Sequence, residues 1–264
     1  MAVSTNHKTV LITGASTGIG YELALLAAQD GHHLVLIARN HERLHELAER
    51  WSGQHKIIVD VIAQDLSEPQ AAEKIVAALQ KEKITVDVLI NNAGFGVSGL
   101  FHDTDWKATA DMLQVNMVAL TRLTQLLLPD MLARKSGKIL NVASTAGFLP
   151  GPLMACYYAS KAYVISFTEA LANELAGSGV TITALCPGPT QTEFQKRAGV
   201  DRSRLFKSSN VMSAAEVAKV GYRAMRRGQT LAIAGFFNAV GMQLLRISPR
   251  KLNAAIVRHI QENA

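Results

Sequence analysis

The chain has 264 residues, of which 48% are apolar and 18% are charged, and it carries a formal net charge of +6. This composition excludes a largely disordered protein, and the length is sufficient for one domain with a substantial core. The basic residues are scattered along the chain rather than clustered with aromatic residues on one element, which argues against a nucleic-acid partner.

Seven short apolar runs predict strands, and longer segments with helical patterns lie between them. The strands are expected at 9–13, 33–38, 56–62, 86–91, 137–143, 180–186 and 230–234, and the helices near 18–30, 40–52, 68–82, 105–134, 157–176 and 214–228. Near-continuous apolar strands that alternate with helices are typical of a parallel sheet covered on both faces. We therefore predict an α/β fold: a single-domain, Rossmann-like, doubly wound parallel sheet of about seven strands.

The first predicted strand runs directly into the glycine-rich loop "TGASTGIG", residues 13–20, and a helix follows. Gly14 allows a tight turn off the strand, Gly18 lets the backbone approach a pyrophosphate, and Gly20 lets the helix and strand pack closely. The N-terminus of the helix presents free N–H groups to anionic oxygens. The loop therefore predicts a dinucleotide-binding site.

The second predicted strand ends in "LIARN", which places Arg39 where dinucleotide-binding folds contact the adenosine ribose. A carboxylate at this position suits the 2′-hydroxyl of NAD. A guanidinium instead matches a 2′-phosphate and can also lie against the adenine ring. Arg39 therefore favours NADP(H) over NAD(H).

The stretch "YYASK", residues 157–161, places a lysine within one helical turn of two tyrosines. Tyr157 and Lys161 are separated by four positions and Tyr158 and Lys161 by three, so helical periodicity alone does not choose between the tyrosines. A free phenol has a pKa near ~10, too high for ready proton exchange at neutral pH, and a cation within about 4–6 Å lowers it. We expect one tyrosine to exchange a proton with help from the lysine.

Six motifs occur in order: "TGASTGIG" (13–20), "NNAG" (91–94), Asn116 in "QVNMVA", Ser144 in "LNVASTAG", "YYASK" (157–161) and "PGPTQT" (187–192). Together they resemble the short-chain dehydrogenase/reductase family over roughly residues 8–235. The resemblance implies that Asn116, Ser144, Tyr157 and Lys161 are catalytic.

The family pattern has three residues between the catalytic tyrosine and the lysine, which selects Tyr157 as the acid/base and leaves Tyr158 as packing or pocket wall. By the same resemblance, Lys161 would bind the nicotinamide ribose and lower the pKa of Tyr157. Ser144 would hold the substrate carbonyl or hydroxyl. Asn116 would support a proton-relay water.

The resemblance also implies a cofactor surface built from several loops. Asp65 would contact the adenine, the "NNAG" loop would line the adenine side and steady the sheet, and the "PG" stretch would meet the nicotinamide. Thr190 and Thr192 would lie near the carboxamide, although many members carry a branched aliphatic residue at position 190. The predicted cofactor contacts are Gly14, Ser16, Thr17, Gly18, Ile19, Gly20, Arg39, Asp65, Leu66, Asn92, Ala93, Gly94, Tyr157, Lys161, Pro187, Gly188, Thr190 and Thr192.

Two further signals are weighed against this interpretation. "HERLH", residues 41–45, matches the zinc-protease pattern H-E-x-x-H, but it opens a helix beside the predicted cofactor and has no apparent third ligand, so we predict no metal site.

The segment 190–212 contains five basic residues against Glu193 and Asp201. It either attracts a phosphorylated carrier such as an acyl thioester or is a solvated loop, and we favour the loop.

The segment 236–264 is expected to be a helical extension of a dinucleotide-binding and catalytic domain spanning 1–235. Apolar residues recur with helical spacing at Leu252, Ile256, Val257 and Ile260. We expect the extension to cover the pocket, to form a subunit contact or to touch a membrane surface, in that order of preference.

The long helices predicted at 105–134 and 157–176 resemble those that form subunit contacts in the family, so a homodimer or homotetramer is expected.

The distribution of cysteines and apolar residues bears on the compartment. Cys156 and Cys186 are too few for a disulfide framework, which fits a reducing compartment. The first ten residues contain no apolar signal core, and the longest apolar stretch, 231–245, is shorter than the roughly 20 residues that cross a bilayer. We expect a cytoplasmic protein without a transmembrane span.

Together these features predict an NADP(H)-dependent oxidoreductase that interconverts a small-molecule carbonyl and a secondary alcohol, with reduction favoured. The alternative from another class is a non-catalytic dinucleotide-binding sensor, which would have no need of the tyrosine. Within the enzyme class, a 3-oxoacyl-thioester reductase and a hydroxysteroid reductase remain open, because the sequence does not identify the substrate.

Overall fold

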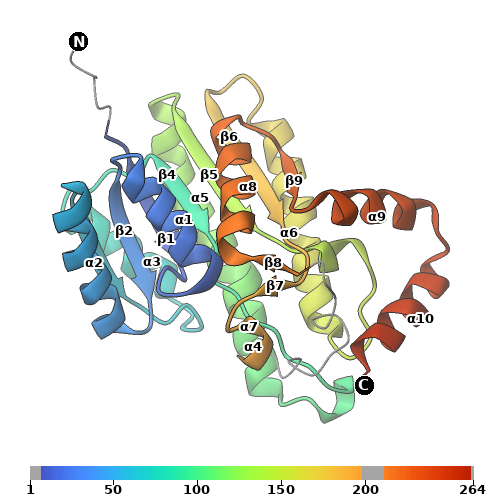
Figure 1. Cartoon of the computed structure of the whole chain (residues 1–264). Coiled ribbons are helices and arrows are strands. Elements are labelled where there is room, and N and C mark those ends of the chain that lie inside the picture. The colour runs from blue at the N-terminus through green and yellow to red at the C-terminus, as the bar shows by residue number, and fades with distance from the viewer. Residues whose placement is uncertain (1–6, 198–210, 263–264) are drawn as a thin grey trace.

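The computed structural model describes residues 7–197 and 211–262, and its centre is a seven-stranded parallel sheet (Figure 1). The strand order is β3-β2-β1-β4-β5-β6-β9. The strands are β1 (Thr9–Thr13), β2 (His33–Ala38), β3 (Val59–Ala63), β4 (Val88–Asn91), β5 (Gly137–Val142), β6 (Val180–Cys186) and β9 (Leu231–Ile233). The predicted doubly wound parallel sheet is confirmed.

Helices cover both faces of this sheet. One face packs against α1, α2 and α8, and the other against α3, α5 and α6. The helices are α1 (Gly18–Gln29), α2 (His41–His55), α3 (Ala71–Lys81), α4 (Trp106–Leu113), α5 (Leu120–Ala133), α6 (Ala155–Glu174), the short α7 (Phe194–Arg197), α8 (Ala214–Arg226), α9 (Phe236–Ile247) and α10 (Arg250–Gln261). Within the described ranges, no helix combines the length and the apolar character that crossing a bilayer requires.

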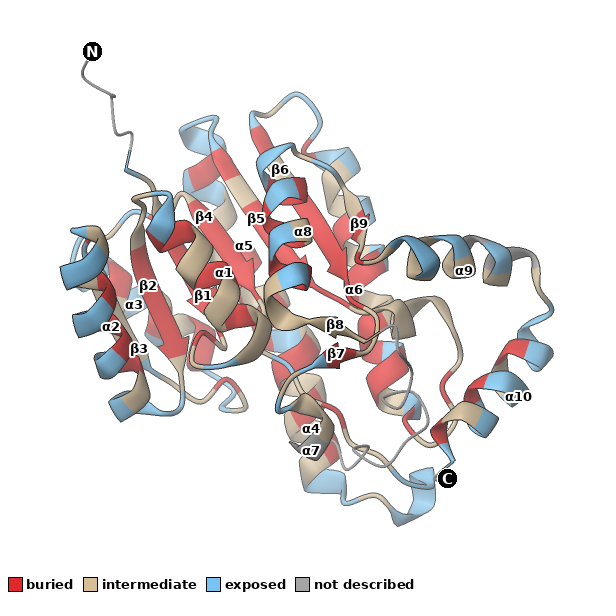
Figure 2. Ribbon diagram, in the orientation of Figure 1, coloured by how far each residue is buried: buried red, intermediate tan, exposed pale blue. Residues whose placement is uncertain are grey.

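Alternation along the strands divides the core into two layers. Val10 and Ile12 of β1 face the cluster that contains α1 and α8, whereas Leu11 between them faces the cluster that contains α3 and α5. Both faces are apolar because a parallel sheet is buried on both sides. Figure 2 shows the central strands largely buried and the helices that cover them partly exposed.

Four details differ from the sequence-based expectation. The third strand begins at Val59 rather than 56, because α2 continues to His55. The single helix expected at 105–134 is interrupted by a π-helical segment, η2 (Gln114–Ala119). Two short strands, β7 (Thr190–Gln191) and β8 (Met212–Ser213), form a separate two-stranded sheet that was not predicted. Single-turn 3₁₀ segments, η1 (Phe101–Asp103) and η3 (Thr145–Phe148), also escaped prediction.

The order in which strands are added to the sheet reverses between β1 and β4. The strands before this point are added on one side of β1 and the later strands on the other side. The loops after β1 and β4 therefore diverge, and they leave a crevice at the carboxyl edge of the sheet, where doubly wound folds bind ligands.

A buried chain of side-chain hydrogen bonds joins the middle strands to two helices. Asn91 of β4 donates to Asn141 of β5 at 2.9 Å and to Thr124 of α5 at 3.1 Å. Asn141 in turn donates to Thr168 of α6 at 3.0 Å. These polar groups are buried, so each hydrogen bond prevents the cost of an unpaired group inside the core.

We expect Asn141→Leu to destabilise the protein by about 1–3 kcal/mol, because an amide proton of Asn91 loses its acceptor inside the core. Urea unfolding would measure the change. Asn173→Ala, which alters an exposed asparagine on α6, is the matched control and should stay within about 0.5 kcal/mol. Equal effects for the two substitutions would contradict a structural role for this network.

Candidate functional site

A cavity of about 1420 Å³ opens at the carboxyl edge of the sheet. Its lining comes from the loops after β1 to β6 and, at the far end, from α9 and α10. Eighteen residues predicted to be functional line this one cavity: Gly14, Ser16, Thr17, Gly18, Ile19, Arg39, Asp65, Leu66, Asn92, Ala93, Gly94, Ser144, Tyr157, Lys161, Pro187, Gly188, Thr190 and Thr192. Two predicted residues, Gly20 and Asn116, are not part of the lining.

The glycine-rich loop after β1 has the backbone that a phosphate-binding turn requires. Gly14 and Gly18 adopt φ angles of +66° and +58°, in the left-handed region that side chains disfavour. Thr17 caps α1 without a side-chain hydrogen bond, so no cap side chain competes for the N–H groups at this helix end. The loop thus fits the diphosphate of a dinucleotide.

Gly20 has a packing role rather than a lining role. A Cβ atom added there would collide with the side-chain amide of Asn92 and with the carbonyl oxygen of Gly14. The Asn92 amide donates to the carbonyl oxygens of Thr13 (3.0 Å) and Gly14 (3.2 Å). Gly20 therefore lets α1 approach this bonded loop closely, and its predicted contact with a cofactor stays a prediction.

The adenosine end of the cavity carries one exposed cation and one fixed carboxylate. The Arg39 side chain is 66% exposed, and its Nη1 atom lies 4.0 Å from Oδ2 of Asp65. The backbone N–H and the hydroxyl of Ser67 each donate to Oδ1 of Asp65 at 2.9 Å. Partial burial raises the pKa of Asp65, but these hydrogen bonds and the charge of Arg39 outweigh it, so that the pKa lies below its ordinary value.

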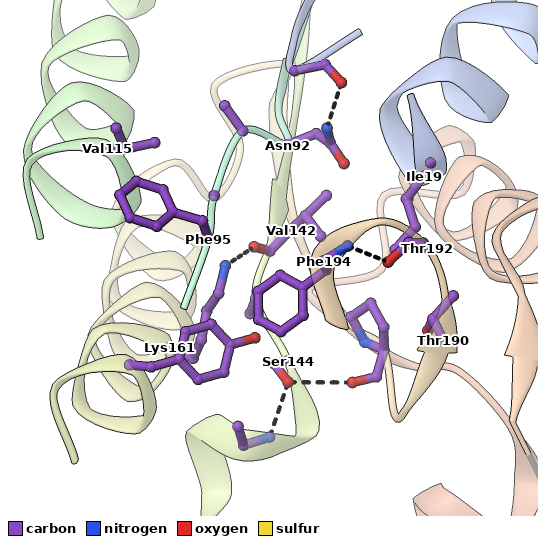
Figure 3. Close-up of a pocket in the computed structure, with 18 of the residues that line it drawn as sticks. Ile19, Asn92, Phe95, Val115, Val142, Ser144, Lys161, Thr190, Thr192 and Phe194 are labelled. Carbon is purple, nitrogen blue, oxygen red and sulfur yellow. Dashed lines mark hydrogen bonds between the residues drawn. The ribbon is translucent and has the colours of Figure 1, made fainter. Parts of the chain in front are cut away.

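At the opposite end, Lys161 and Ser144 lie near Phe194 (Figure 3), and the Tyr157 ring packs against Phe194 with the ring centres 5.3 Å apart. The Lys161 ammonium donates to the carbonyl oxygen of Val142 at 2.9 Å, and its Nζ atom lies 5.8 Å from the centre of the Tyr157 ring. The Ser144 hydroxyl oxygen accepts from the backbone N–H of Ala146 at 3.1 Å. Strand β5 and helix α6 thus bring the serine, the tyrosine and the lysine to one place.

The pKa of Tyr157 is raised above its ordinary value, and the lowering by Lys161 that the resemblance implies stays a prediction. Burial of the phenol is the largest cause, and a hydrogen bond with Ser144 only partly opposes it. Burial also lowers the pKa of Lys161, to about 8, although the neighbouring Cys186 thiolate would act in the opposite direction. The Lys161 ammonium is hydrogen-bonded to the strand carbonyl of Val142 and lies 5.8 Å from the centre of the Tyr157 ring.

Asn116 lies in the π-helical segment η2 and makes three hydrogen bonds. Its amide nitrogen donates to the carbonyl oxygen of Phe95 (3.0 Å) and to the hydroxyl of Ser160 (3.1 Å), and its Oδ1 accepts from the Phe95 N–H at 3.1 Å. The side chain therefore holds the loop after β4 against α6. π-Helical insertions are rare and concentrate at functional sites, but the proposed relay water remains a prediction.

Tyr158 occupies a different environment from Tyr157 although both are buried. Its hydroxyl accepts a 2.8 Å hydrogen bond from Gln261 of α10, and its ring packs edge-on against Tyr157. The role predicted for Tyr158, as packing and pocket wall, agrees with these contacts. The same hydrogen bond attaches the end of the C-terminal extension to the helix that carries Tyr157.

Sequence analysis placed Ile256, Val257 and Ile260 in an extension expected first of all to cover the pocket, but it did not single out Met242 or Leu245. Met242 and Leu245 from α9 and Ile256, Val257 and Ile260 from α10 line the far wall of the cavity. Their apolar, helical spacing was the only signal available, and it could not show which part of the fold they would face.

The H-E-x-x-H match lies on α2, and the basic segment 190–212 is described only in part. His41 and His45 share one face of α2 with their Nε2 atoms 2.9 Å apart, and in the described ranges no group of three or more His, Cys, Asp or Glu could hold a metal ion. Of the basic residues in the segment 190–212, Arg202, Arg204 and Lys207 lie outside the described residues.

A family model described as short chain dehydrogenase matches residues 8–203. The chain belongs to the short-chain dehydrogenase family. Its members are oxidoreductases, and the match covers the glycine-rich loop, the serine and the tyrosine–lysine pair.

Solved structures of this family agree in fold. The short-chain dehydrogenase from Sphingobium yanoikuyae in complex with NADPH is 31% identical, with a TM-score of 0.80, over 92% of this chain and 97% of that one. A short-chain dehydrogenase/reductase from Burkholderia phymatum in complex with NAD is 25% identical, with a TM-score of 0.81, over 91% of this chain and 93% of that one. A nicotinamide dinucleotide is therefore the cofactor class for this short-chain dehydrogenase, and the two neighbours bind different members of that class.

Among curated relatives, the very-long-chain 3-oxoacyl-CoA reductase of Phaeosphaeria nodorum is 38% identical over 176 residues, which is 65% of this chain and 52% of that protein. The similarity thus spans about half of that reductase.

We expect Lys161 to titrate near pH 8 in the ligand-free dehydrogenase, since burial lowers its pKa to about 8 from an ordinary 10.5. Burial disfavours the charged form of an amine, so the pKa shift is downward. Lys161 therefore carries a positive charge below about pH 8 and loses it as the pH rises through that value. Carbon-13 NMR of lysine-labelled protein would measure the midpoint, with Lys161→Met assigning the signal. A midpoint at the ordinary value would show that the ammonium remains well solvated.

Proposed function

We propose that this short-chain dehydrogenase uses NADP(H) to interconvert a carbonyl group and a secondary alcohol, with Tyr157 as the proton donor and acceptor. The observation that carries the proposal is the grouping of Tyr157, Ser144 and Lys161 at one end of a cavity whose other end holds the glycine-rich loop. A dinucleotide lying along the cavity would supply or accept a hydride at that end.

Tyr157 supplies the proton. Burial keeps its pKa above the ordinary value of 10.0, so the phenol is protonated at neutral pH. A protonated phenol is the form that can donate to an oxygen on which negative charge develops, which supports reduction as the favoured direction. Ser144 is hydrogen-bonded to this phenol and is positioned to donate to the same substrate oxygen.

Lys161 and Asn116 set the geometry around the phenol. The 2.9 Å hydrogen bond from Lys161 to Val142 fixes the ammonium between β5 and α6, from where it would bind ribose hydroxyls and stabilise negative charge nearby. Asn116 holds the backbone of Phe95 and the hydroxyl of Ser160, so its side chain is proposed to position α6 while a relay water uses the irregular backbone of η2.

Arg39 supports NADP(H) over NAD(H). Its guanidinium is exposed at the adenosine end, and its 4.0 Å separation from Asp65 leaves most of its donors free for a phosphate. In the nearby carboxylate of Asp65, Oδ1 is bonded to Ser67, and Oδ2 faces Arg39 at a distance longer than a hydrogen bond.

The substrate end favours an uncharged, apolar carbonyl compound. The side chains of α9 and α10 that line the cavity there are mainly aliphatic, and Leu149, Met154 and Phe194 extend the same character. The similarity to a 3-oxoacyl-CoA reductase supports an acyl thioester as the second candidate, and a hydroxysteroid would also suit an apolar pocket. A non-catalytic sensor remains the rival outside the enzyme class, and a homo-oligomeric, cytoplasmic protein remains a prediction.

Tyr157→Phe should lower turnover by about 10²–10⁴-fold while NADPH binding is retained, because only the exchangeable proton is removed. NADPH oxidation against a panel of aliphatic and aromatic ketones would measure turnover, and fluorescence titration would measure binding. Tyr158→Phe is the matched control: it loses only the hydrogen bond from Gln261 and should stay active. Unchanged turnover in Tyr157→Phe would refute the mechanism, and no turnover of any ketone by the unmodified protein would favour the sensor.

Arg39→Ala should abolish a preference for NADPH that is several-fold or more in the unmodified protein, since one charge-assisted contact contributes about 1.5–3 kcal/mol. Dissociation constants for NADPH and NADH would be compared in both proteins. Arg43→Ala, which removes an exposed arginine paired with Glu46 on α2, is the control and should keep the preference. Equal affinities in the unmodified protein would defeat the cofactor assignment.

A further inference from the structure

The helix α9 is apolar on two opposite sides. One side, which includes Met242 and Leu245, lines the cavity. The other side exposes Phe236, Phe237, Val240 and Leu244, whose exposed fractions are 77%, 74%, 43% and 61%. At 3.6 residues per turn these four positions fall within an arc of about 100°, so they form one stripe along the helix.

This stripe lies at the edge of the molecule. Figure 1 shows α9 extending away from the sheet beyond β9 and α10 returning toward the body, on the opposite side from α2 and α3. Figure 2 shows exposed residues along both tail helices. On α10, Leu252 and Ile256 are also exposed, whereas Asn253, Val257 and Gln261 are buried against the body. Exposed clusters of large apolar side chains are uncommon on the surfaces of soluble proteins unless they serve as interaction sites.

The charge of the same segment is strongly one-sided. Residues 236–261 contain four basic residues, Arg246, Arg250, Lys251 and Arg258, and no Asp or Glu, whereas the whole chain carries a net charge of only +6. Arg250 and Lys251 are exposed at the start of α10. Arg258 is exposed as well and pairs with Glu262 at 3.0 Å.

We propose that the outer face of the tail helices, formed by Phe236, Phe237, Val240, Leu244, Arg250 and Lys251, docks on an anionic lipid bilayer. Aromatic and aliphatic side chains on one helix face, bordered by cations, match the boundary between acyl chains and anionic headgroups. A second copy of this chain is the poorer occupant, because a two-fold interface would place this basic segment against itself. The inference does not depend on the proposed reaction, since none of these six residues lines the cavity.

The test is flotation of the full-length protein with vesicles of phosphatidylcholine alone and with vesicles that also contain phosphatidylglycerol. The unmodified protein should bind only the anionic vesicles, and added salt should weaken the binding because it screens charge. Arg250→Glu with Lys251→Glu should lower the partition coefficient by about tenfold or more, given about 1 kcal/mol per basic residue near the surface. The double substitution Phe237→Ser with Leu244→Ser should lower the partition coefficient by a similar factor.

The controls use equally exposed residues elsewhere. Phe101→Ser changes a phenylalanine that is 67% exposed on η1, and Lys81→Glu with Lys83→Glu reverses two exposed lysines at the end of α3. Both controls should bind vesicles like the unmodified protein, and circular dichroism should show every variant folded. Failure of the unmodified protein to bind anionic vesicles, or equal losses in the controls, would overturn the proposal. So would a dimer in sedimentation equilibrium that Phe237→Ser with Leu244→Ser dissociates, because the stripe would then be a subunit contact.

Discussion

The site depends on a buried lysine. Lys161 is only 5% exposed, and its ammonium is hydrogen-bonded to the carbonyl oxygen of Val142 at the end of a central strand. Burial of an ammonium is costly, and here it lowers the pKa to about 8. The cation is nevertheless retained at neutral pH, next to a phenol that burial keeps protonated. The fold thus places a positive charge and an available proton within one helical turn of each other.

The surrounding structure holds this arrangement in place. The network from Asn91 through Asn141 to Thr168 connects β4 and β5 to α6, the helix that carries both Tyr157 and Lys161. Asn116 connects the loop after β4 to the same helix through Ser160. Because these bonds are buried, small displacements of α6 would leave polar groups unpaired. Helix α6 is therefore positioned by polar contacts in addition to apolar packing.

The C-terminal extension gives one segment two environments. The inner sides of α9 and α10 complete the apolar end of the cavity, and the Gln261 to Tyr158 hydrogen bond attaches the extension to α6. The outer side carries exposed apolar and basic residues. An apolar substrate and a lipid surface would thus meet on opposite sides of the same pair of helices.

The sequence alone predicted the parallel sheet and the glycine-rich loop, because apolar strands that alternate with helices, and glycines at turns, are local patterns. Ser144, Tyr157 and Lys161 were predicted from the resemblance to a family. The sequence did not reveal the π-helical segment at Asn116 or the direction of the Tyr157 pKa shift. Burial and distances between residues far apart in the chain determine these features, and so only the tertiary structure could decide them. The extension illustrates the same limit: its helical pattern was readable, but which apolar side faces the cavity and which faces outward depends on how α9 and α10 pack against the rest of the fold.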